Sequence, residues 1–169
     1  MNAPFVPLRV TVRLADPGDR PTIARFLADH PDTTAFHRFE WLDAVERATW
    51  HRTHILLSEQ DGTIRSVLPL HEAHSPLFGR ALVSCGFAVG GGVVGEGDPA
   101  LFAAAQELAV RLNCPSLELR GGPLQSVEGW HVKADSHAGF VNPLAADDNA
   151  QLLAIPRKRV VTRGTNRMG

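Results

Sequence analysis

A glycine-rich run at residues 90–95 is the first feature of the sequence whose spacing could do chemistry. It satisfies the GxGxxG pattern, which cradles a phosphate where the loop opens directly into a helix with free N–H groups. Here Glu96, Gly97 and Asp98 stand between the run and the next predicted helix, and two carboxylates at a helix start repel a pyrophosphate. We therefore interpret the run as a strand and turn in which two backbone segments approach closely.

Four histidines form two pairs whose members are three residues apart, His51 with His54 and His71 with His74. Residues three apart in a strand point to opposite faces of the sheet, so the second pair cannot easily share a metal ion. Residues 71–74 also fall one residue short of the HExxH zinc motif, which requires a helix. We expect no metal site, and we interpret these histidines as polar positions on a strand edge and in a loop.

The two cysteines, Cys85 and Cys114, lie in apolar surroundings without CxxC spacing. This pattern is typical of small buried thiols in a reducing compartment, where burial raises the thiol pKa and makes the group unreactive. The start of the chain has no basic flank followed by an apolar stretch, so it predicts no secretory signal. We expect a cytoplasmic protein.

The densest mixture of aromatic and charged residues lies at the predicted start of the second helix. Phe36, Arg38 and Trp41 stand here together, and aromatic rings beside an arginine often form the wall of a ligand site. In the structural alternative, Phe36 and Trp41 dock the helix, and Glu40 interacts favourably with the positive end of the helix dipole.

Arg80 follows a predicted turn, where it could bind an anion or cap the turn. Glu118 and Arg120 lie on a predicted central strand and would be costly there if buried without partners. They could pair with neighbouring residues or line a cleft. Either Glu40 or Glu118 could serve as a base only if it meets a substrate amine.

Apolar periodicity and turn residues predict the elements that position these residues. The predicted strands cover residues 8–14, 53–58, 63–74, 80–87, 116–120 and 131–141, with residues 88–94 as a continuation of the sheet. The predicted helices begin near residues 16, 38, 98 and 147, and prolines end three of them. Asp61 and Gly62 predict a tight hairpin between two strands. This order predicts a single-sheet α/β or α+β domain.

Composition and charge exclude several classes of protein. The chain has 169 residues, 44% apolar and 21% charged, which is typical of one globular domain, and it has no apolar run long enough to cross a membrane. Residues 157–169 carry five bases and no acid, whereas the rest of the chain carries 12 bases and 18 acids. We expect a basic, disordered tail on an acidic body, and no specific nucleic-acid partner.

Several stretches, in order, resemble one family. They are residues 36–46, 67–70, 75–84, 91–92, 117–120 and 154–158. On these stretches the chain resembles the FemAB-like acyltransferases of the PEP-CTERM/exosortase-associated group, and the resemblance covers about residues 33–159. It implies an α/β, GNAT-like fold with a mixed, mostly antiparallel sheet flanked by helices.

The family resemblance also implies a function. Relatives carry two GNAT-like halves and transfer an acyl or aminoacyl group to an amine of a cell-wall or exopolysaccharide precursor. Their donor is acyl-CoA or aminoacyl-tRNA. Residues 1–156 correspond to the N-terminal half, and residues 157–169 lie where the second half would begin. The acyl-CoA pyrophosphate loop of single GNAT enzymes is not found after the hairpin region.

Three hypotheses follow. In the first, the chain is the N-terminal half of such an acyltransferase, inactive alone and without a cofactor of its own, and Phe36, Arg38, Trp41 and Arg80 bind a small-molecule or glycan-precursor substrate. In the second, it is a non-catalytic module that binds a ligand or partner. In the third, an exposed apolar face docks a second GNAT-like half and makes the isolated chain associate.

Overall fold

The computed structural model describes residues 10–77, 79–122, 129–134 and 143–154. The chain divides into two compact units, residues 1–130 and residues 131–169. The second unit contains the helix α4 (Asp148–Leu153), which confirms the last predicted helix, and Asp147 caps it by accepting the Ala150 N–H at 2.9 Å. His131–Ala134 are not in a strand, so that part of the predicted strand 131–141 is wrong. The rest of this strand and the predicted tail 157–169 lie outside the described residues.

A six-stranded sheet forms the centre of the first unit, with the path β1-β2-β3-β4-β6 and with β5 paired to β3. The strands are β1 (Val10–Leu14), β2 (Arg52–Gln60), β3 (Thr63–Ser75), β4 (Gly79–Ser84), β5 (Val94–Gly95) and β6 (Ser116–Glu118). Antiparallel pairing joins β1 to β2, β2 to β3, β3 to β4 and β3 to β5, whereas β4 and β6 are parallel. The predicted α/β class is confirmed, with a mixed and mostly antiparallel sheet.

Local capping signals place the helices of the first unit. Its helices are α1 (Arg20–Asp29), α2 (Phe39–Thr49) and α3 (Pro99–Arg111), and 3₁₀ turns at Pro17–Asp19 and Ala35–His37 precede the first two. Asp16 caps the first 3₁₀ turn by accepting the Gly18 N–H at 2.7 Å, and Asp98 caps α3 by accepting the Ala100 N–H at 2.8 Å. Both caps are followed by proline at the first helical positions, as the sequence predicts.

The predicted hairpin is confirmed, but the strand that follows it is shorter than expected. Asp61 and Gly62 have φ values of 51° and 75°, the left-handed pair that a type I′ turn requires. β4 ends at Ser84 rather than at residue 87, because Cys85 and Phe87 have φ values of 41° and 64° and cannot continue a strand. Of the predicted continuation at residues 88–94, only Val94 is in a strand, β5.

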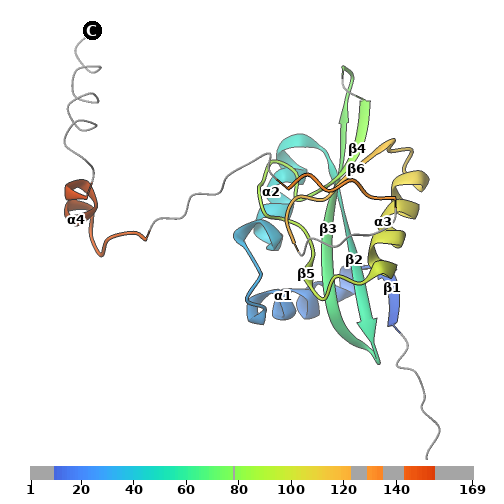
Figure 1. The fold of residues 1–169 in the computed structure, drawn as a ribbon, viewed down its shortest axis with the longest axis horizontal. Helices are drawn as coiled ribbons and strands as arrows, with labels where there is room; N and C mark the ends of the chain where they lie inside the picture. The colour runs from blue at the N-terminus through green and yellow to red at the C-terminus, as the bar shows by residue number, and fades with distance from the viewer. Residues whose placement is uncertain (1–9, 78, 123–128, 135–142, 155–169) are drawn as a thin grey trace, which may run out of the picture. The chain divides into compact units, whose positions relative to one another are not determined.

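Helices cover both faces of the sheet (Figure 1). On one face, Leu56, Leu70 and Leu82 pack with α3 residues such as Leu101 and Leu108. On the other face, the α1 residues Ile23 and Leu27 pack against Leu57 and Val67, and Leu42 of α2 packs with Cys85 and Ala88. Because each face of the central strands is covered, the sheet carries two cores, and polar side chains inside them need internal partners.

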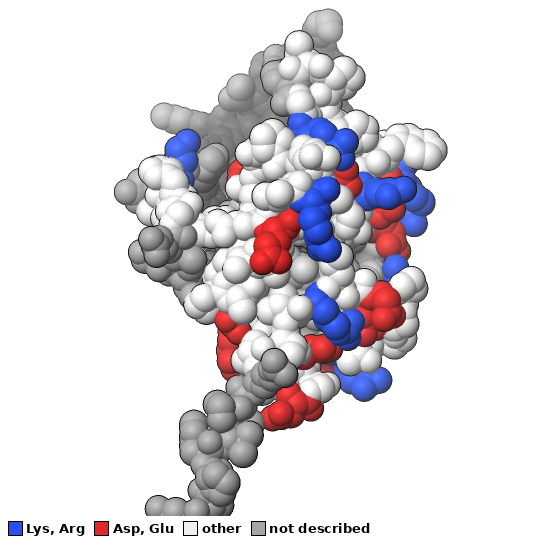
Figure 2. Space-filling model, turned by 90° about the vertical axis from the view of Figure 1, so that its right-hand side faces the viewer, with Lys and Arg blue, Asp and Glu red and all other residues white. Residues whose placement is uncertain are grey.

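Charged side chains of both signs are interspersed on the face of the molecule that Figure 2 draws. Arg13 forms a closely bound cluster with two acids, since it donates to Asp19 at 2.6 Å and to Glu59 at 2.8 Å. These hydrogen bonds hold the Asp19 pKa down at about 2 and raise the Arg13 pKa. Among the described residues, none of the helices combines the length and apolar character that a bilayer crossing requires.

Candidate functional site

The parallel pair β4 and β6 is the place in this sheet where a ligand site is expected, since α3 makes the crossover between the two strands. Ligands of α/β sheets bind beyond the carboxyl ends of such strands. The main-chain pairing of β4 and β6 ends at Val83 and Glu118. Beyond this pair, a side chain joins the two segments, since Ser84 Oγ accepts the Arg120 N–H at 2.7 Å. We call the region beyond this point, where main-chain pairing of β4 and β6 stops, the strand wedge.

Residues 90–93, the glycine segment, are in close contact with both sides of the strand wedge. A Cβ atom built on Gly92 would lie 1.9 Å from the Gly121 carbonyl oxygen, and one on Gly91 would lie 2.0 Å from Cys85 Cβ. A Cβ on Gly122 would lie 2.9 Å from the Val93 nitrogen. The interpretation of close backbone approach is therefore confirmed, and only glycine fits at Gly91 and Gly92. The chain itself closes the strand wedge.

His37 holds the glycine segment from the side of α2. Its Nδ1 accepts the Thr34 N–H at 3.0 Å, so the hydrogen is on Nε2, which donates to the Gly92 carbonyl at 3.1 Å. The Thr34 hydroxyl donates to the Gly90 carbonyl at 3.4 Å. His37 is 2% exposed, and this burial lowers its pKa. It is therefore a neutral, fixed side chain.

Cys85 lies at the end of β4, in contact with the glycine segment. Its thiol donates to the Phe36 carbonyl at 3.1 Å, and burial raises its pKa to about 12. Burial likewise raises the pKa of the Cys114 thiol. The prediction of two buried thiols is confirmed. A thiol with so high a pKa is not a nucleophile at neutral pH.

The start of α3 does not fit the pyrophosphate of an acyl-CoA. Asp98 already accepts the Ala100 N–H, and the exposed carboxylate of Glu96 lies two residues earlier. Both place negative charge where an anion would need positive potential. Together with the closed strand wedge, this leaves no cradle for a CoA donor among the described residues.

The structure separates the four predicted site residues. The Phe36 and Trp41 rings contact each other edge to face, with their centroids 4.9 Å apart. Both rings pack beside the core formed by Leu42, Cys85 and Ala88. Arg38 is exposed and lines a cavity of about 220 Å³ between α1 and α2. The other residues that line this cavity are Ala24, Leu27, Ala28, Phe39 and Glu40.

Arg80 lies elsewhere, at the start of β4, and forms an ion pair with Glu72. Arg80 is not among the residues that line the cavity beside Arg38. The Glu72 carboxylate also contacts His54 Nε2 at 3.2 Å. Arg80 and Arg38 therefore do not line one pocket.

The remaining polar candidates have structural partners. Arg120 donates to Glu118 at 2.9 Å, so these two residues pair with each other. His71 is completely buried rather than at a strand edge, because α2 covers its face of β3, and its Nδ1 accepts the Gly86 N–H at 2.9 Å. The described residues contain no group of three or more His, Cys, Asp or Glu side chains that could hold a metal ion.

Sequence reasoning did not single out His37, Thr34 or Ser84 as residues that organise the site. The spacing of Thr34 and His37 carries a signal, because Thr34 caps the 3₁₀ turn and the His37 ring accepts the cap's N–H. This is the reciprocal arrangement of a capping box, with histidine in place of the usual acid or amide. The contacts of the glycine segment carry no such local signal.

Comparisons with known proteins bear on the fold. No protein-family model matches the sequence, and no curated protein matches it. A solved structure, the ribosomal-protein-alanine N-acetyltransferase from Brucella melitensis biovar Abortus, matches with a TM-score of 0.51 at 18% identity, over 79% of this chain and 99% of that chain. The chain has a GNAT-type fold. A GNAT family acetyltransferase from Staphylococcus aureus also matches, with a TM-score of 0.46 at 15% identity, over 80% of this chain and 98% of that chain.

Proposed function

We propose that the chain is a GNAT-type lobe of an acyltransferase similar to the FemAB-like, PEP-CTERM/exosortase-associated enzymes, and that it binds the amine acceptor. The acceptor class is a cell-wall or exopolysaccharide precursor. In this proposal the chain does not hold acyl-CoA or aminoacyl-tRNA by itself. The observation that carries the proposal is a GNAT-type sheet whose strand wedge is closed by the chain's own glycine segment.

The cavity between α1 and α2 supports acceptor binding. Arg38 and Glu40 place opposite charges beside the apolar side chains of Leu27 and Phe39. A precursor that carries both phosphates and a free amine would meet a cationic and an anionic group there. Phe36 and Trp41 fix the start of α2, which follows Arg38 directly. Arg80 is a second, separate candidate contact for the acceptor's anionic groups.

Exposed apolar side chains support docking to a second GNAT-like half. Trp50 is 83% exposed, Phe87 64% and Val89 80%, so these three side chains offer apolar surface to a docking partner. The same closed strand wedge supports the second candidate function, a non-catalytic module that binds a ligand or a partner. The two candidates differ in whether the chain recognises an amine-bearing precursor.

An NMR titration with a soluble UDP-linked cell-wall precursor that carries a free amine tests the proposal. We expect saturable shifts around the start of α2, and we expect Arg38→Gln to weaken binding about tenfold, as the loss of one charge-assisted contact does. Arg111→Gln, an exposed arginine at the end of α3, is the matched control and should bind as the unmodified chain does.

No binding by the folded chain would contradict the acceptor role and favour the non-catalytic module. Equal binding by the Arg38→Gln variant would show that the cavity between α1 and α2 is not the acceptor site.

A further inference from the structure

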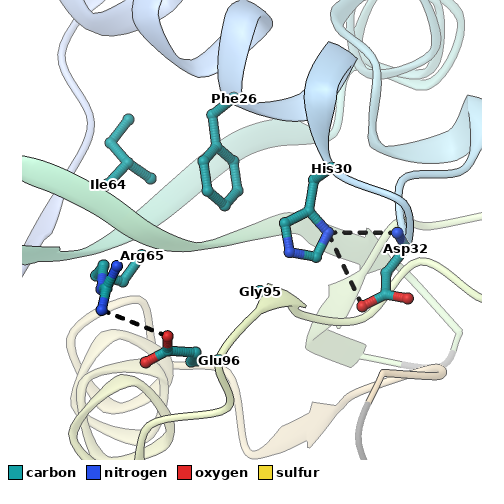
Figure 3. A pocket seen from close by; sticks show the side chains of 7 residues that line it. All are labelled: Phe26, His30, Asp32, Ile64, Arg65, Gly95 and Glu96. Atoms are coloured by element: carbon teal, nitrogen blue, oxygen red, sulfur yellow. Dashed lines mark hydrogen bonds and ion pairs between the residues drawn. The ribbon is translucent and has the colours of Figure 1, made fainter.

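A second cavity, of about 250 Å³, lies between α1 and the start of β3, away from Arg38 (Figure 3). We call it the α1–β3 pocket. Its lining residues are Phe26, His30, Asp32, Ile64, Arg65, Gly95 and Glu96. The cavity is open to solvent and slightly smaller than the roughly 300–1,000 Å³ typical of pockets for drug-sized ligands, so it suits a small organic ligand.

One part of the α1–β3 pocket is apolar. Phe26 and Ile64 provide this surface, and the Phe26 and His30 rings lie 5.3 Å apart at an angle of 33°. Gly95 has a φ of 98°, and a Cβ there would lie 2.1 Å from the Arg65 carbonyl, so backbone alone lines the pocket at this position. An apolar side chain of a ligand could pack against Phe26 and Ile64.

The polar and charged groups around the pocket are paired only loosely. Arg65 Nη2 is 3.6 Å from Glu96 Oε1, and His30 Nδ1 is 3.8 Å from Asp32 Oδ2, so neither contact is a hydrogen bond. In contrast, the ion pairs of three other arginines, Arg13, Arg20 and Arg120, have distances of 2.6, 2.5 and 2.9 Å. The charges of the α1–β3 pocket therefore keep hydrogen-bonding capacity for a ligand.

The donors and acceptors of the pocket can be assigned. The Asp32 N–H donates to His30 Nδ1 at 3.3 Å, which leaves the hydrogen of the neutral ring on Nε2. Figure 3 shows this second nitrogen on the side of the ring away from Asp32, toward Gly95. His30 and Arg65 thus offer donors to an anion, whereas Asp32 and Glu96 offer carboxylates to a cation.

We propose that the α1–β3 pocket binds a free α-amino acid with an apolar side chain. The ligand carboxylate accepts from Arg65 and His30, the ammonium group donates to Asp32 or Glu96, and the side chain packs against Phe26. A zwitterion satisfies both loose pairs at once, which a singly charged ligand of the same size cannot do. This proposal does not depend on the acyltransferase function, because no residue of the strand wedge or of the Arg38 cavity takes part in it.

Titration of the full chain with L-leucine, followed by NMR, tests the proposal. We expect saturable binding with a Kd on the order of 1 mM, and at least tenfold weaker binding of L-leucinamide and of N-acetyl-L-leucine, which each lack one of the two charges. Arg65→Gln should weaken leucine binding about tenfold, since Arg65 is a surface residue whose loss leaves the core intact. Arg47→Gln, exposed on α2, is the control and should bind leucine normally.

Three results would each overturn the proposal. They are no saturable leucine binding by the folded chain, equal binding of leucine and its two blocked derivatives, and unchanged binding by the Arg65→Gln variant. Asp32→Asn is a second variant, at the acidic side of the pocket. It should weaken the binding of L-leucine more than the binding of N-acetyl-L-leucine, which has no ammonium group. The reverse order would also overturn the assignment.

Discussion

Replacing Gly92 by alanine will lower the free energy of unfolding by about 3 kcal/mol, the upper end of what overpacking a tight contact costs. The new Cβ would lie 1.9 Å from the Gly121 carbonyl oxygen and 2.4 Å from its carbon, so backbone rather than a flexible side chain must move. Because the glycine segment and Gly121 form the two sides of this contact, the variant also opens the strand wedge. Urea denaturation followed by circular dichroism measures the change.

Gly86→Ala is the matched control for this prediction, since Gly86 belongs to the same loop. A Cβ there would lie 3.5 Å from the His71 ring, an ordinary contact, and Gly86 does not have a positive φ. We expect a change of less than about 1 kcal/mol. Equal stability of the Gly92→Ala variant and the unmodified chain would show that the glycine segment does not contact Gly121 in solution.

His37→Ala will cost about 3 kcal/mol at about pH 8, because it leaves a cavity and two polar groups, one buried and one half-buried, without partners. These groups are the Thr34 N–H and the Gly92 carbonyl, which bond the two nitrogens of the ring. Thermal or urea unfolding measures the loss. The predicted loss is large for an imidazole because both ring nitrogens are used.

The stability difference between the unmodified chain and His37→Ala should also depend on pH, and the direction of this dependence can be predicted. Burial lowers the His37 pKa below its ordinary value of 6.5, so the folded state binds fewer protons than the unfolded state. The stabilisation by neutral His37 is complete above about pH 6.5 and is lost as the pH falls. We therefore expect the stability difference between the unmodified chain and His37→Ala to narrow between about pH 7 and pH 5.

His71 titrates in both proteins and does not affect this difference, although its lowered pKa also makes each protein less stable in acid. If the stability difference between the unmodified chain and His37→Ala stays constant or widens on acidification, the neutral, buried state of His37 would be contradicted.

The parts of the fold that follow from local signals could be predicted from the sequence. Asp98, followed by proline, starts α3 where expected, whereas Asp16, also followed by proline, caps a 3₁₀ turn that leads into α1 at Arg20. Asp61 with Gly62 forms the predicted hairpin turn. Such signals act between neighbouring residues, so spacing in the sequence is enough to recognise them. The family resemblance correctly implied the GNAT-type fold.

The parts that depend on distant contacts could not be predicted in the same way. Gly92 meets Gly121 only after β4, α3 and β6 are folded, and no local pattern records that contact. His71 stands next to Glu72 at the end of an apolar run, where an exposed position is expected, yet residues 66–71 are all buried because helices cover both faces of β3. The apolar residues around Cys85 predict that it lies in a strand, but its positive φ ends β4.

Isothermal calorimetry of acetyl-CoA with the full chain, combined with hydrogen exchange at residues 90–93, tests the closed strand wedge most directly. A GNAT acetyltransferase that binds acetyl-CoA serves as the positive control under the same conditions. We predict no heat beyond dilution and no change in exchange of the glycine segment, because Gly92 and Gly121 already occupy the wedge. Saturable binding, with exchange at residues 90–93 altered by acetyl-CoA, would contradict the account.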